Sequence, residues 1–475
     1  MISNLHKSGT SRILETDEEI VAVIDKIYTY YAETSLIVGP IGNMFTVFFH
    51  DLVIHFSGIL IQRVSSGSNV DVPIFPYVDK RYSISPYRVD LHMSLESVVR
   101  EPFKDWLREI QIIPLAIGNS LPHGYKQQWL TSKLVSLLGA FQRPVKSFLP
   151  KQRQQIEILL ACIGELCSVH EIPAVGILQD NWKRYAEAHT IGEQTALNQH
   201  TVVLGNRQDL QNRKLAVNFL QQDKDVVAFT HGEIASTVFD EPMYGYAERN
   251  LCSTLVEYGK RNIEEPNNKV LVRPKVILYR NSSVAQTRYR RSERIETKDL
   301  NQSKVLYIPT TYVGNQIYGP FHAYEDLVYR KWHSALVEAI PSLTVKVHPK
   351  SSVELQPPGQ LERRWLDDCI DEYDVLIIDY VATSAVLSIV SDKPVIYFDI
   401  GLRRLSKEFE HDLHARCQYE RIDIKGNLQE QIHDCLEKYT GANRSWSNIA
   451  IEKYIINNDE KFSWFELIHK ATFPD

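Results

Sequence analysis

Apolar residues in the carboxyl-terminal third of the chain fall into short continuous runs and do not alternate with polar ones. The runs at residues 375–378 and 395–398 are separated by an apolar segment of helix length, and an earlier run at 344–347 stops at His348. Buried parallel strands have this pattern. It predicts a β-α-β series with polar side chains at the carboxyl ends of the strands, where open α/β sheets bind ligands.

The same succession of strand and helix occurs earlier in the chain. An apolar run at 202–204 leads through Gly205 into a segment of helix length, and a second run follows at 226–229. One more run lies at 275–280, and the next opens at Lys304. Two successive units of this kind predict an α/β protein with two Rossmann-like domains.

The remaining segments have other patterns. Apolar spacing and composition predict helices over residues 17–34, 93–110, 126–141, 151–170, 324–340 and 443–473. Residues 35–64 are rich in β-branched and aromatic side chains and predict two or three strands. His50, Asp51 and His55 lie in this stretch and suggest a metal site. Because residues five apart face opposite sides of a strand, structural histidines are the favoured interpretation.

Composition narrows the class of protein. The chain has 475 residues, 44% hydrophobic and 24% charged, which is typical of a globular protein with two or three domains. Its net charge of −6 argues against a general nucleic-acid binder. Six scattered cysteines predict reduced thiols, and the pattern contains neither a signal peptide nor a membrane span. We expect a cytoplasmic protein, with peripheral contact to the inner face of the membrane left open.

The polar residues at the strand ends suit an anionic ligand. His348 can donate a hydrogen bond to an oxygen, and Pro349 fixes the local turn. Thr383 and Ser384 lie where the next helix would begin, and free backbone N–H groups at a helix start favour anions. A single His-Pro pair is most often only a turn. The combination with the hydroxyl pair is what predicts a phosphate site.

These strings resemble a known group of enzymes. VKVHPK, YDVLIIDYVATSAV and DKPVIYFD are similar to the carboxyl-terminal half of bacterial surface-polysaccharide transferases of the GT-B type. This group includes Kdo transferases, polysialyltransferases and CDP-glycerol glycerophosphotransferases. The resemblance covers residues 304–399 and, less closely, 201–260. It implies an α/β GT-B fold, in which two Rossmann-like domains face each other across a cleft and the second binds a cytidine nucleotide.

By this resemblance, the residues that bind the donor nucleotide are Lys346, His348, Pro349, Thr383, Ser384, Thr310 and Thr311. The resemblance also implies an acceptor and catalytic domain, a linker, a nucleotide domain, and a helical tail that packs back toward the first domain. These parts are residues 1–290, 291–303, 304–440 and 441–475. Residues 287–298, where the linker is placed, are charged and aperiodic and contain four arginines. These arginines could bind anionic glycan or phospholipid, although a solvated hinge is favoured.

A carboxylate in the first domain is the predicted catalytic group. Glu233 follows a strand end and a glycine, and could take the proton of an acceptor hydroxyl or attack the anomeric carbon. His231 could adjust the pKa of Glu233 or protonate a leaving oxygen. Capping of the following helix is the structural alternative. Asp240 and Glu241 form the reserve carboxylate pair.

An acidic donor sugar needs a cationic partner. Arg207 and Arg213 are the candidates for binding a donor carboxylate, and an exposed helix face explains them equally well. No metal is expected, because the only DxD string, at 223–225, precedes a strand, whereas a metal–nucleotide site should follow one. Phosphate charge would then be met by helix N–H groups, His348 and hydroxyls.

The sequence therefore predicts a metal-independent glycosyltransferase with a CMP-activated donor. It would move Kdo or another nonulosonic acid to a glycan or lipid-linked glycan acceptor in capsule, O-antigen or lipopolysaccharide synthesis. A CDP-alditol-dependent glycerol- or ribitol-phosphate transferase shares the two donor motifs and stays open. Two further alternatives stay open, a non-catalytic glycan- or nucleotide-binding scaffold and a UDP-sugar epimerase, because proteins with two Rossmann-like domains support many chemistries. No nucleic-acid partner is expected.

Overall fold

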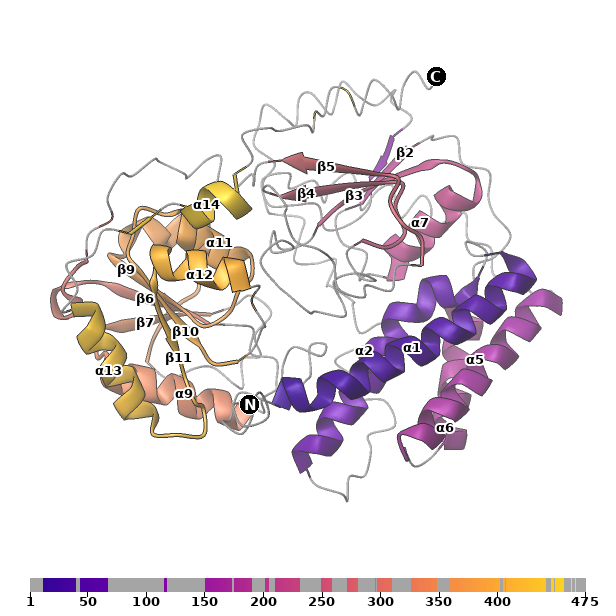
Figure 1. The fold of residues 1–475 in the computed structure, drawn as a ribbon, viewed down its shortest axis with the longest axis horizontal. Coiled ribbons are helices and arrows are strands. Elements are labelled where there is room, and N and C mark those ends of the chain that lie inside the picture. Colours follow the sequence, from indigo (N-terminus) through magenta and orange to yellow (C-terminus); the bar gives the residue numbers. More distant parts are fainter. Residues whose placement is uncertain are drawn as a thin grey trace.

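A computed structural model gives the chain an α/β architecture with two sheets of parallel strands and a group of long helices (Figure 1). The structure describes residues 12–39, 43–66, 115–117, 150–172, 175–189, 201–204, 210–230, 249–258, 271–280, 295, 297–309, 326–347, 359–401, 405, 407–440, 446–447, 449–456, 463 and 466. The α/β class predicted from the alternation of strands and helices is confirmed.

Within the described residues, the first sheet contains five parallel strands in the order in which they occur along the chain. They are β1 Leu115–Ile117, β2 Thr201–Leu204, β3 Asp225–Phe229, β4 Thr254–Tyr258 and β5 Val276–Arg280. Strands β2, β3 and β5 confirm three predicted runs, and α7 Leu210–Gln221 is the predicted helix between β2 and β3. The pattern missed β4, whose apolar run is interrupted by the buried Glu257.

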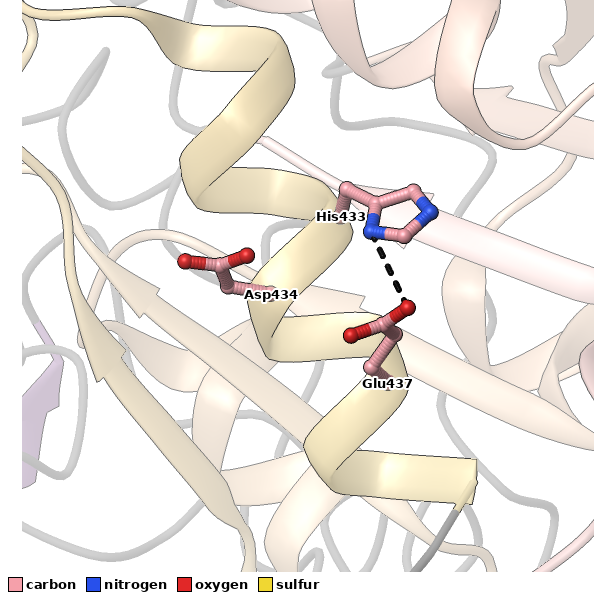
Figure 2. A group of neighbouring side chains, drawn as sticks. All are labelled: His433, Asp434 and Glu437. Carbon is pink, nitrogen blue, oxygen red and sulfur yellow. Dashed lines mark ion pairs between the residues drawn. The ribbon is translucent and has the colours of Figure 1, made fainter.

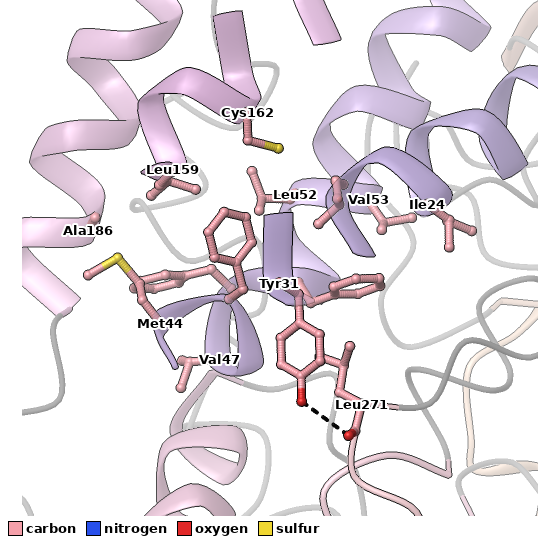
Figure 3. Close-up of a cluster of buried hydrophobic side chains, with 14 of the residues drawn as sticks. Ile24, Tyr31, Met44, Val47, Leu52, Val53, Leu159, Cys162, Ala186 and Leu271 are labelled. Atoms are coloured by element: carbon pink, nitrogen blue, oxygen red, sulfur yellow. Dashed lines mark hydrogen bonds between the residues drawn. The ribbon is translucent and has the colours of Figure 1, made fainter. Parts of the chain in front are cut away.

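Among the described residues, four long helices accompany this sheet. They are α1 Arg12–Val38, α2 Met44–Ser66, α5 Pro150–Val169 and α6 Val175–His189. Helices α1 and α5 confirm two predictions, whereas the helices predicted over 93–110 and 126–141 lie outside the described residues. Their buried side chains share one core with α7 and one face of the first sheet. Figure 3 shows part of this core, where the Tyr31 hydroxyl donates a hydrogen bond to the Leu271 carbonyl at 3.2 Å.

Residues 35–64 do not form the predicted strands. They form the end of α1 and most of α2, and the described side chains of α2 from Met44 to Leu60 are all buried. α2 packs against α1, α5 and α7. A helix that is apolar on all sides belongs in a core, and burial of this kind overrides the strand preference of β-branched and aromatic residues.

The described part of the second sheet contains six parallel strands in the order β11-β10-β9-β6-β7-β8. They are β6 Val305–Ile308, β7 Leu343–Lys346, β8 Gln360–Glu362, β9 Val375–Ile378, β10 Val395–Asp399 and β11 Gln418–Arg421. The chain begins at the centre with β6, adds β7 and β8 on one side, and then returns to place β9 on the other side of β6. Strands β6, β7, β9 and β10 confirm the predicted runs. Strands β7 and β9 are not adjacent in the sheet, because β6 lies between them.

Helices cover both faces of the second sheet, as the return of the chain requires. They are α9 Asp326–Ala339, α11 Thr383–Val390, α12 Lys407–Arg416, α13 Leu428–Thr440 and α14 Ile449–Tyr454, with the short α10 Leu366–Cys369. α9 and α13 share one core with the face that carries Tyr307 and Phe398. α11, α12 and α14 share the other core with the face that carries Ile308 and Ile378.

The predicted linker and tail belong to the second domain where they are described. Ile295 and Leu300 are buried in the same core as α9, and Lys298 Nζ lies 2.8 Å from a carboxylate oxygen of Asp374. The described part of the tail, α14, packs on α12. There the Tyr454 hydroxyl donates to Asp412 at 3.1 Å. This places α14 on the helices of the second sheet, and the return of the tail toward the first domain stays a prediction.

The cysteines agree with the prediction of reduced thiols. All six are buried and none forms a disulfide. Burial raises the pKa of the Cys417 and Cys435 thiols to about 12, so both are protonated packing residues at neutral pH. Within the described ranges, no helix combines the length and the apolar content that crossing a bilayer requires.

Candidate ligand site at the carboxyl edge of the second sheet

Strands β6 and β9 form the topological switch point of the second sheet. β6 leads toward α9, which covers one face, and β9 leads into α11, which covers the other. The register pairs Ile308 with Ile378, so the two strands end level with each other. Open α/β sheets bind ligands at such a point, because the diverging connections leave a crevice outside the carboxyl ends of the strands. This edge is the candidate site.

The first turn of α11 opens at this edge. Its N-cap residue, Ala382, is extended and provides no side-chain cap, and only the N–H groups of Ala385 and Val386 bond back to the Ala382 carbonyl. Thr383 and Ser384 are half-buried, and their hydroxyls make no hydrogen bond within the described part of the chain. Free N–H groups and hydroxyls at a helix start are donors suited to an anion. The predicted placement of Thr383 and Ser384 at a helix start is confirmed.

Lys346 brings a buried cation to the same edge. It is the last residue of β7, which neighbours β6, and it is 5% exposed. Its Nζ donates to the Val347 carbonyl at 2.8 Å. Burial lowers the pKa of Lys346, while Cys369 and Glu362 act in the opposite direction. A lysine held largely out of water at a strand end is a reasonable partner for an anionic ligand.

Asp379 was given no role by the sequence pattern, although it directly follows β9. It is 1% exposed and its Oδ2 accepts hydrogen bonds from the Tyr307 hydroxyl and, at 3.2 Å, from the Trp332 indole N–H. The Trp332 N–H also donates to the Tyr307 oxygen at 3.0 Å. We call these three residues the Asp379 network. The sequence did contain a signal for this residue, namely an acidic side chain directly after the apolar run at 375–378.

Many predicted site residues lie outside the described part of the chain. These are His231, Glu233, Asp240, Glu241, Arg207, Thr310, Thr311, His348 and Pro349. Three of their sequence neighbours, Thr230, Pro309 and Val347, are described and stand at the carboxyl ends of β3, β6 and β7. The strand ends that precede these residues are therefore as predicted, while the roles of their side chains stay predictions.

Arg213 does not fit its predicted role. It lies on α7 at 3% exposure, and its guanidinium donates to Asp51 Oδ2 at 2.7 Å and to the Val47 carbonyl at 2.7 Å. The Tyr185 hydroxyl donates to the same Asp51 oxygen at 3.0 Å. The guanidinium thus binds a carboxylate of the protein itself, inside the helical core. The prediction that Arg213 binds a donor carboxylate is wrong, because the sequence does not show that α2 covers this helix face.

The histidines of α2 are packing residues. His50 and His55 are each 2% exposed, and His55 Nδ1 accepts a hydrogen bond from the Trp182 indole N–H at 2.9 Å. Burial lowers the pKa of His55 to about 3, so its imidazole is neutral at neutral pH. This agrees with the favoured interpretation, although the segment is a helix and not a strand.

One group of acidic and histidine side chains in the described ranges has the spacing for a metal ion (Figure 2). It consists of His433, Asp434 and Glu437 on α13, whose ligand atoms lie within 4.8 Å of one another. All three are exposed, and His433 Nδ1 lies 3.5 Å from Glu437 Oε1 as an ion pair of residues one helical turn apart. Exposed pairs of this kind are common on helix surfaces, and no strand end contributes to the group. It carries no argument for a metal site.

No protein-family model matches the chain, and no curated protein matches it in sequence. The described part of the candidate site consists of Lys346, Thr383 and Ser384 beside the switch point of β6 and β9.

Proposed function

We propose that the chain is a glycosyltransferase of the GT-B type that uses a CMP-activated sugar, either Kdo or another nonulosonic acid, to extend a bacterial surface glycan. The observation that carries the proposal is the uncapped first turn of α11, with Thr383 and Ser384, at the switch point of a doubly wound sheet. The resemblance of the strings around His348 and Thr383 to cytidine-dependent transferases supplies the nucleotide.

The donor half of this site supports stabilisation of a leaving phosphate without a metal. When the bond between the anomeric carbon and the phosphate oxygen breaks, negative charge develops on CMP. Helix N–H groups and the hydroxyls of Thr383 and Ser384 would donate hydrogen bonds to it, and the Lys346 ammonium would add charge. His348, which follows β7 in the sequence, is the proposed additional donor.

The acceptor half is proposed to lie at the carboxyl edge of the first sheet. The acceptor hydroxyl attacks the anomeric carbon, CMP departs with the electrons of the broken C–O bond, and Glu233 takes the hydroxyl proton. A double displacement through a glycosyl-Glu233 intermediate gives the opposite stereochemical outcome. His231 would adjust the pKa of Glu233, and Asp240 or Glu241 would replace Glu233 if its substitution leaves turnover intact.

Isothermal titration of the full chain with CMP, CDP, UDP and GDP in the presence of a chelator tests the donor assignment. We expect selective binding of CMP. A preference for CDP would favour the alternative of a CDP-alditol-dependent glycerol- or ribitol-phosphate transferase, which shares the donor motifs. Selectivity for UDP or GDP would contradict the cytidine assignment and leave an epimerase or another Rossmann chemistry open.

Two variants separate binding from catalysis. His348→Ala should weaken CMP binding, and a variant that binds CMP as the wild type does would contradict the donor site. Glu233→Gln should keep CMP binding and lose turnover of CMP-Kdo or CMP-nonulosonate, measured as CMP release. If the wild type binds CMP but releases none from any donor, the non-catalytic scaffold is the better description.

A further inference from the structure

The Asp379 network joins three of the four elements around the switch point, namely β6, α9 and β9. Tyr307 comes from β6, Trp332 from α9, and Asp379 from the end of β9. The His333 ring packs edge-on against Tyr307 with centroids 5.3 Å apart, and Phe398 packs in the same way against Trp332 at 5.3 Å. Burial lowers the pKa of His333 to about 3, so this neighbour is a neutral ring at neutral pH. The carboxylate is thus held in a largely aromatic core.

A carboxylate in this position is not what a core needs for stability. Burying an ionised group is unfavourable unless donors compensate it, and apolar residues of similar volume often replace buried charged groups without loss of stability. Other residues of this face near the strand ends, such as Ile377 and Phe398, are apolar. What distinguishes Asp379 is its place, because Ala382, three residues later, is the N-cap of α11.

We infer that Asp379 is a positioning residue for an anion bound by α11. Through Tyr307 and Trp332 it fixes the turn of residues 379–382 and thereby directs the free N–H groups of the first turn of α11 at the ligand. Its side chain faces the core shared with α9, whereas α11 covers the other face, so Asp379 does not touch the ligand. The identification of the anion as a nucleotide phosphate rests on the proposed function. The role of Asp379 in fixing the turn of residues 379–382 is independent of the proposed function.

Asp379→Asn keeps the shape of the side chain and removes its charge. Isothermal titration of this variant with CMP and with cytidine separates the phosphate contact from the base and ribose contacts. We expect CMP to bind about 10-fold more weakly, the equivalent of one lost hydrogen bond to a charged group, and cytidine to bind as in the wild type. Equal losses for CMP and cytidine would indicate general distortion and overturn the inference.

Asp412→Asn is the matched control. Asp412 is also buried, at 8% exposure, and accepts a hydrogen bond from the Tyr454 hydroxyl at 3.1 Å, but it joins α12 to α14 and not the two switch-point strands. This variant should lose thermal stability and keep the CMP affinity of the wild type. Tyr307→Phe is the second variant should Asp379→Asn fail to fold. It removes one donor to Asp379, and it should weaken CMP binding in the same direction.

Hydrogen exchange tests the same inference without a ligand. The amides of residues 380–386 should exchange faster in Asp379→Asn than in the wild type or in Asp412→Asn, because the turn has lost its anchor. Unchanged exchange there overturns the inference, whatever the chain binds. Faster exchange in a protein whose wild type binds none of the four nucleotides would instead contradict the proposed function and leave the anchoring role of Asp379 in place.

Discussion

At the residue scale, the hydroxyl of Thr383 gives the sharpest test of the candidate site. It makes no hydrogen bond within the described part of the chain. If it binds a phosphate oxygen, Thr383→Val should weaken CMP binding about 10- to 100-fold, because a hydrogen bond to a charged group contributes about 1.5–3 kcal/mol. The melting temperature should stay near that of the wild type, since no internal bond is lost. Thr383→Ser should retain the affinity, and a Val variant with unchanged affinity would remove Thr383 from the site.

The sequence could predict the place of a residue only where its partners lie close to it along the chain or at the same edge of a sheet. Lys346, Thr383 and Ser384 were predicted to share one edge, because the carboxyl ends of parallel strands meet there, and their strands do so. Arg213 could not be assigned in this way. Its partner Asp51 lies 162 residues earlier, and no local pattern reports a contact of that range.

At the scale of elements, Arg213 and Asp51 fasten α7 to α2. In Arg213→Met, Asp51 would stay buried with only the Tyr185 hydroxyl as donor, and we expect a loss of about 3–5 kcal/mol in the free energy of unfolding by urea. Lys438→Met is the control. It breaks the exposed ion pair with Glu420, at 2.9 Å, and should cost less than about 1 kcal/mol. Weaker CMP binding at unchanged stability in Arg213→Met would restore its predicted donor role.

The elements that the pattern missed share a physical cause. Residues 35–64 were expected as strands because β-branched and aromatic residues favour strands on a half-buried surface. α2 is instead enclosed on all sides, and a fully buried apolar segment has no polar face whose period distinguishes helix from strand. Strands β8 and β11 were missed for the opposite reason. They are the edge strands of the second sheet, and the half-polar sequences QLE and QYER show little apolar content.

At the scale of the whole molecule, the alternation of strands and helices was sufficient to predict two parallel sheets but not the order of their strands. Each β-α-β unit has the same local sequence pattern, whether its second strand is placed on one side of the first strand or on the other. The return after β8, which places β9 beside β6, creates the switch point, and it depends on the packing of the complete sheet. The cleft between two facing domains of the GT-B type stays a prediction.

Three buried histidines should make the whole fold sensitive to acid. His50 and His55 on α2 and His333 on α9 are each at most 2% exposed. Burial lowers the pKa of His55 and His333 to about 3, and burial together with Arg213 lowers that of His50. Their ordinary value is 6.5. As the pH falls below this value, the unfolded chain binds protons that the folded chain does not, so folding becomes less favourable.

We therefore expect full stability above about pH 6.5 and a loss of up to about 1.4 kcal/mol per pH unit for each of these histidines below it. Exposed carboxylates titrate mainly below about pH 4.5 and contribute little to a slope between pH 6.5 and 5. Burial raises the pKa of Asp51, and a raised pKa in the folded state makes folding more favourable as the pH falls, so Asp51 cannot cause a loss of stability in this interval. Urea unfolding across this interval measures the slope. His55→Gln retains an acceptor for the Trp182 N–H and cannot take up a proton, so its slope should be smaller by about 1.4 kcal/mol per pH unit. A wild-type stability that is flat over the interval would mean that these imidazoles are hydrated in the native protein, which is incompatible with the closed core around α2.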